Sequence, residues 1–363
     1  MNRNEARLYV GSVLTGESSK YTIGRLIGFG GQTGVFHAVQ AGSGREVAVK
    51  VLGFEGRSPH GSEDFGRELA LLDRLAGCPN VVTLLDRGCY EVQLEARGRG
   101  RFPVQVPFMV LDRAVTGFHR LPKGGDRASW RERMRLYRDI VAGVQQMHAA
   151  GYAHRDIKAS NCLVYDAEPC GRITDVGVGA DIGGALHPPA ATRVSSISRG
   201  DPLFAPPELI WGHPASAPRG HLRVDLYLLG SLLYECATAK GITAAALGGP
   251  ERWPLLGATT AEDPGETATP KPIIGLRSHF DGAYAVFAAA VPRSIAEGAL
   301  ALLRQLTDPD PALREPVGPH GEVADYGDLR WLLERVDGLV ELLPHEDGGS
   351  AGHGGGDPFE HSA

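Results

Sequence analysis

His-Arg-Asp-Ile-Lys-Ala-Ser-Asn, residues 154–161, places an acid, a base and an amide within one short segment. Asp156 can accept the proton of an attacking hydroxyl group, and Lys158 can neutralise charge that develops on a transferred phosphoryl group. Asn161 can offer its amide oxygen to Mg²⁺. The segment therefore predicts phosphoryl transfer from a metal-bound triphosphate to a hydroxyl group, and the flanking sequence has to support this prediction.

The composition of the chain is that of a globular protein. Its 363 residues suffice for one large bilobal unit or two ordinary domains, and 42% of them are hydrophobic. The 43 acidic and 37 basic residues give a net charge of −6, which argues against a general nucleic-acid-binding protein. The five scattered cysteines form no C-x-x-C pair, which favours a reduced, cytoplasmic chain.

The sequence predicts no membrane insertion. Residues 1–20 are polar and lack the apolar core of a signal peptide. The longest apolar runs, residues 224–237 and 283–303, are interrupted by charged residues or proline. A soluble protein is expected.

The first third of the chain predicts strands and a single helix. β-Branched and aromatic residues between glycine-containing turns indicate strands at residues 21–28, 34–40, 45–52, 81–86 and 107–112. Phe65, Leu69 and Leu72 recur at helical spacing and predict a helix over residues 62–76. Residues 87–106 are predicted as a solvated hairpin loop, with a docking surface for an acidic partner as the alternative.

After Gly117 the pattern becomes helical. Apolar stripes predict buried helices at residues 129–148, 224–238 and 295–306, with His148 as a core residue. Residues 239–272 are predicted as irregular connections, and the tail from residue 345 lacks the apolar residues needed for order. Strands followed by helices predict an α+β fold with two lobes and a cleft between them.

Residues 28–35, Gly-Phe-Gly-Gly-Gln-Thr-Gly-Val, form a glycine-rich turn between the first two predicted strands. Glycines allow backbone N–H groups to approach a triphosphate closely. The turn is no Walker A loop, because no Gly-Lys-Ser/Thr follows, and it opens no helix as a Rossmann fingerprint would. Alone it would be an ordinary hairpin.

Lys50 ends the strand sequence Val-Ala-Val-Lys, and a lysine beneath an apolar cleft requires a counter-charge. Glu68, on the predicted helix 62–76, is the expected partner, although each residue alone would be read as solvent-exposed. Asp-Val-Gly at residues 175–177 resembles the D-F-G motif of protein kinases, and the resemblance implies that Asp175 holds Mg²⁺ and that Gly177 permits the turn that follows. The segments around Glu208, Asp225 and Arg314 also resemble kinase motifs. This resemblance implies that Glu208 pairs with Arg314 and that Asp225 braces residues 154–161, in roles that serve folding.

In this order, the motifs resemble those of eukaryotic-like (Hanks-type) Ser/Thr protein kinases over residues 21–340. The resemblance implies a bilobal fold, with an N-terminal extension at 1–20, an N-lobe at 21–113, a C-lobe at 114–340 and a disordered tail at 341–363. It implies transfer of the γ-phosphoryl group of ATP, with Mg²⁺ or alternatively Mn²⁺, to Ser/Thr of protein substrates and of the kinase itself in trans. The Ala-, Gly-, Arg- and Pro-rich composition suggests an actinobacterial member.

The resemblance also assigns the site residues. The catalytic set is Asp156, Lys158 and Arg155, and the metal ligands are Asn161 and Asp175. By analogy, adenine would contact the backbone of residues 112–114, with Ala48 and Leu163 above and below it. The nucleotide-binding set is Gly28, Gly30, Val35, Ala48, Lys50, Glu68, Asp112, Ala114 and Leu163.

Several positions depart from the family pattern. Thr33 takes the place of the third glycine, Val176 that of a phenylalanine, and Asp201 that of a threonine that bonds the catalytic Asp and Lys. Asp201 can accept a hydrogen bond from Lys158 but would repel ionised Asp156. It is therefore expected either to hold the activation segment in order without phosphorylation or to weaken binding of the peptide substrate.

Arg155, next to the catalytic Asp, is typical of kinases that are activated by phosphorylation. The candidate phosphorylation sites are Thr192, Ser195, Ser196 and Ser198.

Two other functions remain as alternatives. A nucleotide-binding pseudokinase is suggested by the substitutions at residues 33, 176 and 201, although no metal-binding or charge-neutralising position is missing. A small-molecule kinase of the aminoglycoside-phosphotransferase type would share the catalytic Asp and Asn. Such an enzyme would not be expected to carry Glu208, Asp225 and Arg314 together.

Overall fold

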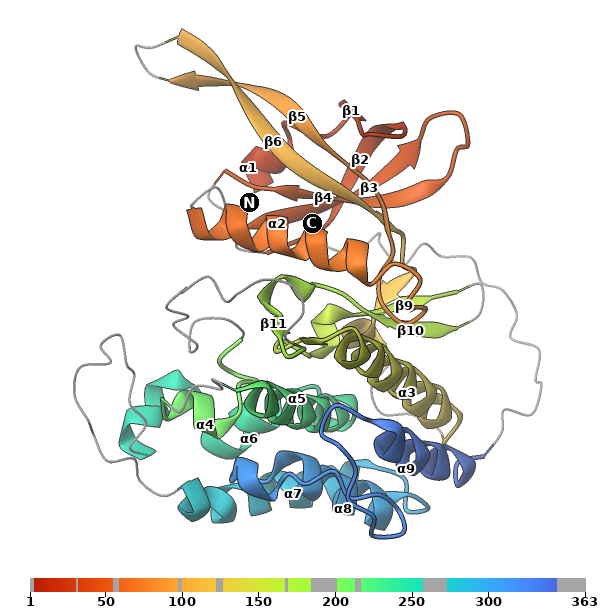
Figure 1. Ribbon diagram of the computed structural model, residues 1–363, viewed down its shortest axis with the longest axis vertical. Coiled ribbons are helices and arrows are strands. Elements are labelled where there is room, and N and C mark those ends of the chain that lie inside the picture. Colours follow the sequence, from red (N-terminus) through yellow and green to blue (C-terminus); the bar gives the residue numbers. More distant parts are fainter. Residues whose placement is uncertain are drawn as a thin grey trace.

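The computed structural model describes residues 3–30, 32–54, 59–96, 100–121, 127–166, 169–183, 201–212, 217–256 and 273–344. The chain forms a strand-rich lobe above a mainly helical lobe (Figure 1). This arrangement confirms the prediction of an α+β fold with two lobes.

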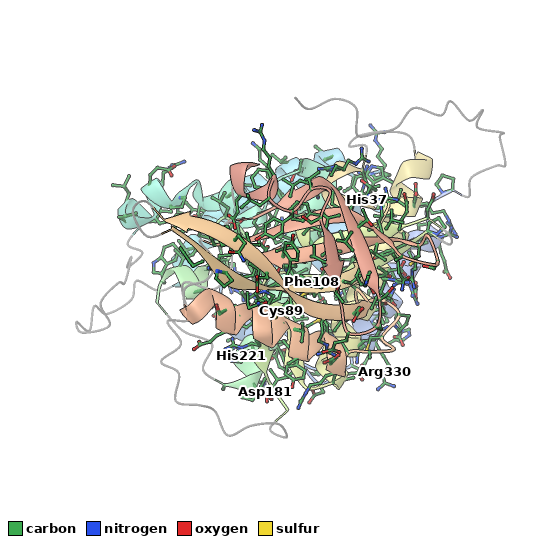
Figure 2. All side chains as sticks on the ribbon, turned by 90° about the horizontal axis from the view of Figure 1, so that it is seen from above. His37, Cys89, Phe108, Asp181, His221 and Arg330 are labelled. Carbon is green, nitrogen blue, oxygen red and sulfur yellow. The ribbon has the colours of Figure 1, made fainter. Side chains whose placement is uncertain are left out.

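The N-lobe is built on one antiparallel sheet of six strands in the order β1-β2-β3-β4-β6-β5. Alternate residues of β3, such as Phe36 and Ala38, and the three valines of β4, Val47, Val49 and Val51, are buried in its core. Figure 2 looks down on this sheet, with Phe108 of β6 within it. The strands are β1 (Val13–Thr15), β2 (Lys20–Phe29), β3 (Thr33–Gln40), β4 (Glu46–Leu52), β5 (Leu84–Ala96) and β6 (Gly100–Asp112).

The hairpin predicted over residues 87–106 is present, but its two sides are paired strands and not loop, which corrects that part of the prediction. Strands β5 and β6 stay paired from Leu84 to Ala96, and the hairpin they form projects beyond the rest of the lobe (Figure 1). The cause is a period-2 pattern in which Val92 faces the core and pairs with the partly buried Val104, while Glu91 and Gln93 alternate with it. The residues between the two strands, 97–99, lie outside the described part.

The described residues of the N-terminal segment pack on the N-lobe. The ring of Tyr9 is buried and lies 5.6 Å from that of Phe36, centroid to centroid. Glu5, on the short helix α1 (Arg3–Ala6), accepts a 2.5 Å hydrogen bond from the backbone N–H of Phe54. Residues 3–20 therefore contribute to the core of this lobe.

Asp86, on strand β5, holds the turn between β1 and β2 through hydrogen bonds. Its carboxylate accepts hydrogen bonds from the backbone N–H of Glu17 at 3.1 Å and of Ser19 at 3.2 Å, and from the hydroxyl groups of Ser18 at 2.8 Å and Tyr21 at 2.9 Å. Burial alone would raise the pKa of Asp86, but the hydrogen bonds, led by that of Ser18, lower it. The neighbouring carboxylate and burial raise the pKa of Tyr21 to about 12.

Asp86→Ala is expected to lower the free energy of unfolding by about 2–3 kcal/mol, because six donors lose a charged acceptor: the backbone N–H groups of residues 17, 18, 19 and 87 and the hydroxyl groups of Ser18 and Tyr21. The lowered pKa means that this stabilisation is complete above the unfolded-state pKa of about 4 and is lost as the pH falls through the folded-state pKa. The difference from wild type, measured by urea unfolding, should therefore shrink between about pH 5 and pH 3. Asp73→Ala removes an exposed acid as the control, and an equal loss in both variants would contradict the prediction.

The C-lobe is organised around helix α5 (Pro218–Thr238), which is buried along most of its length. Leu229 and Leu233 are fully buried, and neighbouring helices pack around them. Among the described residues, no helix is both long and apolar enough to cross a membrane. The other long helices are α3 (Arg127–Ala149), α7 (Arg277–Ala290), α8 (Ala296–Thr307) and α9 (Arg330–Glu341).

Part of the predicted irregular segment 239–272 is helical, which corrects that prediction. Helix α6 (Ile242–Leu247) buries both of its apolar ends, and a 3₁₀ segment spans Pro250–Leu256. The Gly- and Ala-rich composition concealed this short helix, whose stability comes from packing against α7. Residues 257–272 lie outside the described part of the chain.

Candidate active site

The segment 154–161 forms a loop between the short strands β8 (Tyr152–Ala153) and β9 (Cys162–Tyr165). Asp225, fully buried on α5, accepts hydrogen bonds from the backbone N–H of His154 at 2.8 Å and of Arg155 at 2.7 Å. His148 Nε2 lies 2.8 Å from the same carboxylate. Burial alone would raise the pKa of Asp225, but the hydrogen bond from His148 and the proximity of His148 and His154 lower it. A buried anion thus fixes the loop, with Arg155 held at a positive φ of 68°.

Asp156 is held by three groups around its carboxylate. Asn161 Nδ2 donates to Oδ2 at 2.8 Å and also to the backbone carbonyl of Asp156 at 2.8 Å. The backbone N–H of Asp201 donates to Oδ1 at 3.2 Å. Lys158 Nζ lies 3.2 Å from Oδ2. The structure therefore brings together the acid, the amide and the base that the sequence motif predicted.

The groups around Asp156 form a first cluster of polar side chains, and Lys50, on β4, is the centre of a second cluster. Its Nζ lies 2.7 Å from both carboxylate oxygens of Glu68 and 2.9 Å from Oδ1 of Asp175. Glu68 is supplied by helix α2 (Pro59–Arg74), whose apolar residues Phe65 and Leu72 pack into the core. The predicted pairing of Lys50 with Glu68 is thus present.

The charges of this cluster stabilise one another. Burial would lower the pKa of Lys50, but Asp175 and Glu68 raise it above its usual value. The positive charge of Lys50 lowers the pKa of Asp175, whereas burial raises that of Glu68. At neutral pH, Lys50 and Asp175 are therefore ionised, and the ammonium group is shared between the two acids.

Asp175 sits in a turn that links the two clusters. Its φ is 63°, and the 3₁₀ turn that follows, Val176–Val178, packs against α2. Gly177 allows a close approach to α2, because a Cβ atom there would lie 3.1 Å from the carbonyl oxygen of Asp64, closer than a normal contact. Val176, in place of the family's phenylalanine, is fully buried.

The residue before Asp175 joins this turn to the catalytic loop. The backbone N–H of Thr174 donates to the carbonyl of Asn161 at 2.9 Å, and its own carbonyl lies 3.0 Å from His154 Nε2. Asp175 therefore has a fixed position relative to the loop that carries Asp156.

The oxygen atoms of Asn161 and Asp175 suit a small, hard cation. Because Nδ2 of Asn161 faces Asp156, its amide oxygen points away from that residue. The side chain of Asp175 is 51% exposed, so a carboxylate oxygen is accessible from the cleft. Carboxylate and amide oxygens fit Mg²⁺, which retains water for its remaining coordination positions. The described residues contain no group of three or more His, Cys, Asp or Glu side chains arranged to hold a metal ion, so a cation here would rely on Asn161, Asp175 and nucleotide oxygens.

The remaining nucleotide-binding candidates line the boundary between the lobes. Val35, Ala48 and Leu163 belong to the apolar cluster that extends from the N-lobe into the C-lobe. A Cβ atom at Gly30 would meet no atom of the described residues within 4 Å, so none of them fills the space beside this turn. A Cβ atom at Gly28 would lie 3.9 Å from Cβ of Val35.

The side chain of Asp112, at the end of β6, makes contacts within the protein, whereas the sequence resemblance implies a contact with the adenine only through the backbone of this residue. Its buried carboxylate accepts hydrogen bonds from the backbone N–H of Thr83 at 2.9 Å and the hydroxyl of Tyr165 at 3.2 Å, and it pairs with Arg172. The connection between the lobes is thus fixed by residues of both. No described residue hydrogen-bonds to the backbone N–H or C=O of Ala114, which leaves them available to a ligand.

Sequence reasoning missed the contribution of Arg172 to this site. The residue lies on β10 (Cys170–Ile173), and its guanidinium stacks on the ring of Tyr165 at 4.3 Å. No local pattern could have identified it, because a single arginine on a short strand usually faces solvent.

Arg155, within the loop 154–161, is buried and lies close enough to His221 of α5 to influence its charge. Burial and the charge of Arg155 lower the pKa of His221 to about 4, so this histidine is neutral at physiological pH. The candidate phosphorylation sites Thr192, Ser195, Ser196 and Ser198 lie outside the described residues.

The predicted ion pair between Glu208 and Arg314 is also present. The two side chains make a bidentate contact with N–O distances of 2.6 and 2.8 Å, and Arg314 is fully buried. This pair joins the start of α4 (Pro207–Ile210) to the segment that follows α8.

Comparison with known proteins agrees with this geometry. The Ser/Thr-protein kinase PknK of Mycobacterium tuberculosis is 32% identical over 216 residues, which are 58% of this chain and 17% of PknK. PknA of the same species is 32% identical over 228 residues, 61% of this chain and 48% of PknA. The probable Ser/Thr-protein kinase PknB of Corynebacterium glutamicum is 28% identical over 225 residues, 61% of this chain and 32% of PknB.

The matched region therefore spans less than half the length of these relatives, all of them from actinobacteria. Their similarity confirms the resemblance to bacterial Hanks-type Ser/Thr kinases. The protein kinase domain matches residues 21–315, which include every residue of both clusters. The chain belongs to the protein kinase domain family.

Proposed function

We propose that this chain is a Ser/Thr protein kinase that transfers the γ-phosphoryl group of ATP to protein hydroxyl groups, its own included. The observation that carries the proposal is the contact of Lys50 with both Glu68 and Asp175, next to the loop that holds Asp156, Lys158 and Asn161. All charged groups required for phosphoryl transfer stand within two linked clusters.

In this proposal, the N-lobe residues position the donor nucleotide. Lys50 contacts the α- and β-phosphates, and Glu68 keeps its ammonium group in the cleft. Val35, Ala48 and Leu163 supply apolar contacts to the adenine, and the backbone of Ala114 supplies its hydrogen bonds. Mg²⁺, when bound to Asn161 and Asp175, neutralises charge on the β- and γ-phosphates.

The catalytic loop carries out the transfer. Asp156 orients the acceptor hydroxyl and takes its proton, because its carboxylate is fixed by Asn161 and the backbone of Asp201. Lys158 stabilises the negative charge of the phosphoryl group in flight. Arg155 is proposed to bind a phosphate on the activation segment, if that segment is phosphorylated.

The test is to incubate the purified chain with [γ-³²P]ATP and Mg²⁺ and then to map phosphorylated residues by mass spectrometry. Lys50→Met, which keeps a long side chain without charge, is expected to lower incorporation at least about 10²-fold. Lys240→Met, which removes an exposed lysine after α5, is the control and should retain wild-type incorporation.

Phosphorylated Ser or Thr in the wild-type chain, without phosphorylation in Lys50→Met, would support the proposal. Nucleotide binding without any transfer, in Mg²⁺ or Mn²⁺, would contradict it and favour the pseudokinase alternative. Unchanged incorporation by Lys50→Met would contradict the role given to this lysine.

A further inference from the structure

Asp201 places a second carboxylate next to Asp156. Its Oδ2 lies 3.6 Å from Lys158 Nζ, which itself lies 3.2 Å from Oδ2 of Asp156. One ammonium group is therefore shared between two carboxylates, and these three side chains carry a net charge of −1. The threonine of the family motif at this position could accept the same hydrogen bond from lysine but would add no charge.

The carboxylate of Asp201 is fixed by its own turn. Its Oδ1 accepts a 3.0 Å hydrogen bond from the backbone N–H of Leu203, and its backbone carbonyl accepts from Phe204 at 3.0 Å and Ala205 at 3.1 Å. Its position thus does not depend on Lys158. The side chain is 31% exposed, against 11% for Asp156, so its negative charge faces the open side of the site.

This charge lies where the acceptor segment has to bind. A hydroxyl group held by Asp156 lies about 2.6–3.2 Å from its carboxylate, whose Oδ1 is 3.2 Å from the backbone nitrogen of Asp201. Consecutive Cα atoms of the acceptor segment are about 3.8 Å apart. The side chains next to the acceptor therefore come within about one Debye length of Asp201, roughly 8 Å at physiological ionic strength.

We propose that Asp201 selects acceptor segments that carry a Lys or Arg directly beside the phosphorylated Ser or Thr. The inference rests on the proposed kinase function and names the substrate class of the same site. When Lys158 turns to the phosphoryl group, Asp201 loses part of its counter-charge, and a cation of the acceptor replaces it. An acidic neighbour would instead meet an uncompensated carboxylate.

The experiment compares synthetic peptides with one central Ser or Thr in a neutral background and Arg, Gln or Glu at either neighbouring position. For wild type, we expect kcat/KM to be about tenfold higher with Arg than with Glu at the preferred neighbour, mainly through KM. The ratio should fall at 0.5 M NaCl, where exposed charges are screened. In Asp201→Asn, which keeps the shape of the side chain, the Arg-to-Glu ratio of kcat/KM should fall to about one. Asp201→Glu should keep a preference for Arg.

The control is Glu91→Gln, which removes an acidic charge from the distant hairpin and should keep the tenfold ratio. An active Asp201→Asn enzyme with an unchanged ratio would overturn the inference and leave the kinase function standing. If Asp201→Asn is inactive, the binding of peptides that carry Ala in place of the acceptor Ser or Thr is measured by fluorescence anisotropy instead. Loss of the Arg preference in binding supports the inference, and its retention overturns it. A wild-type chain that phosphorylates neither itself nor any peptide would contradict the kinase function itself.

Discussion

Asp156→Asn is expected to lower kcat by about 10²- to 10⁴-fold, because an amide cannot accept the proton of the acceptor hydroxyl. The surroundings add to this loss. Oδ2 of Asp156 faces two donors, Asn161 Nδ2 at 2.8 Å and Lys158 Nζ at 3.2 Å, so an amide NH₂ group at that position would oppose both. An amide turned the other way would oppose the backbone N–H of Asp201. The asparagine therefore cannot reproduce the native hydrogen bonds in either orientation.

The measurement is the initial rate of phosphoryl transfer at saturating ATP, together with thermal unfolding of each variant. Asp73→Asn, an exposed acid paired with Arg87 on the N-lobe, is the matched control and should retain wild-type kcat. If Asp156→Asn has less than a tenfold effect while folded, Asp156 is not the group that accepts the proton.

The arrangement of the candidate site could be predicted largely from sequence because its residues occur in short segments. The segment 154–161 brings Lys158 and Asn161 within reach of the carboxylate of Asp156, on a loop that Asp225 of α5 holds in place. The partner of Lys50 lies 18 residues away, yet the apolar stripe of α2 showed which face of that helix turns inward. The inward position of Glu68, and hence its pairing with Lys50, follows from that orientation.

The residues that sequence analysis missed act through long-range contacts without a local pattern. Arg172 reaches Asp112 from 60 residues away, and Asp86 binds a turn that precedes it by 68 residues. Each is a single charged residue in an otherwise ordinary strand, so its partners can be identified only once segments distant in sequence have folded together. The role of Asp201 could be stated only as alternatives, because its distances to Lys158 and Asp156 decide which groups it contacts.

Arg314→Ala is expected to lower the free energy of unfolding by about 3–5 kcal/mol, because it leaves the buried carboxylate of Glu208 without its counter-charge. Arg314 is fully buried and also donates to the backbone carbonyl of Asp308 at 2.7 Å, and its guanidinium lies 4.6 Å from the ring centre of Tyr227. Its removal also opens a cavity beneath α5. The loss should appear as a lower urea midpoint.

A double-mutant cycle separates the ion pair from the lost packing. Glu208→Gln combined with Arg314→Met should be less destabilised than the sum of the two single variants, since neither charge is then left alone. Arg330→Met is the surface control, because the side chain of Arg330 is 79% exposed and its contact with Asp328 is solvated (Figure 2). Its urea midpoint should equal that of wild type.

Additive losses in the cycle would show that Glu208 and Arg314 stabilise the C-lobe through packing rather than through their charges. A large coupling energy would show that the ion pair holds the segment after Asp201 against α5. The pair would then also maintain the geometry of the acceptor side of the site.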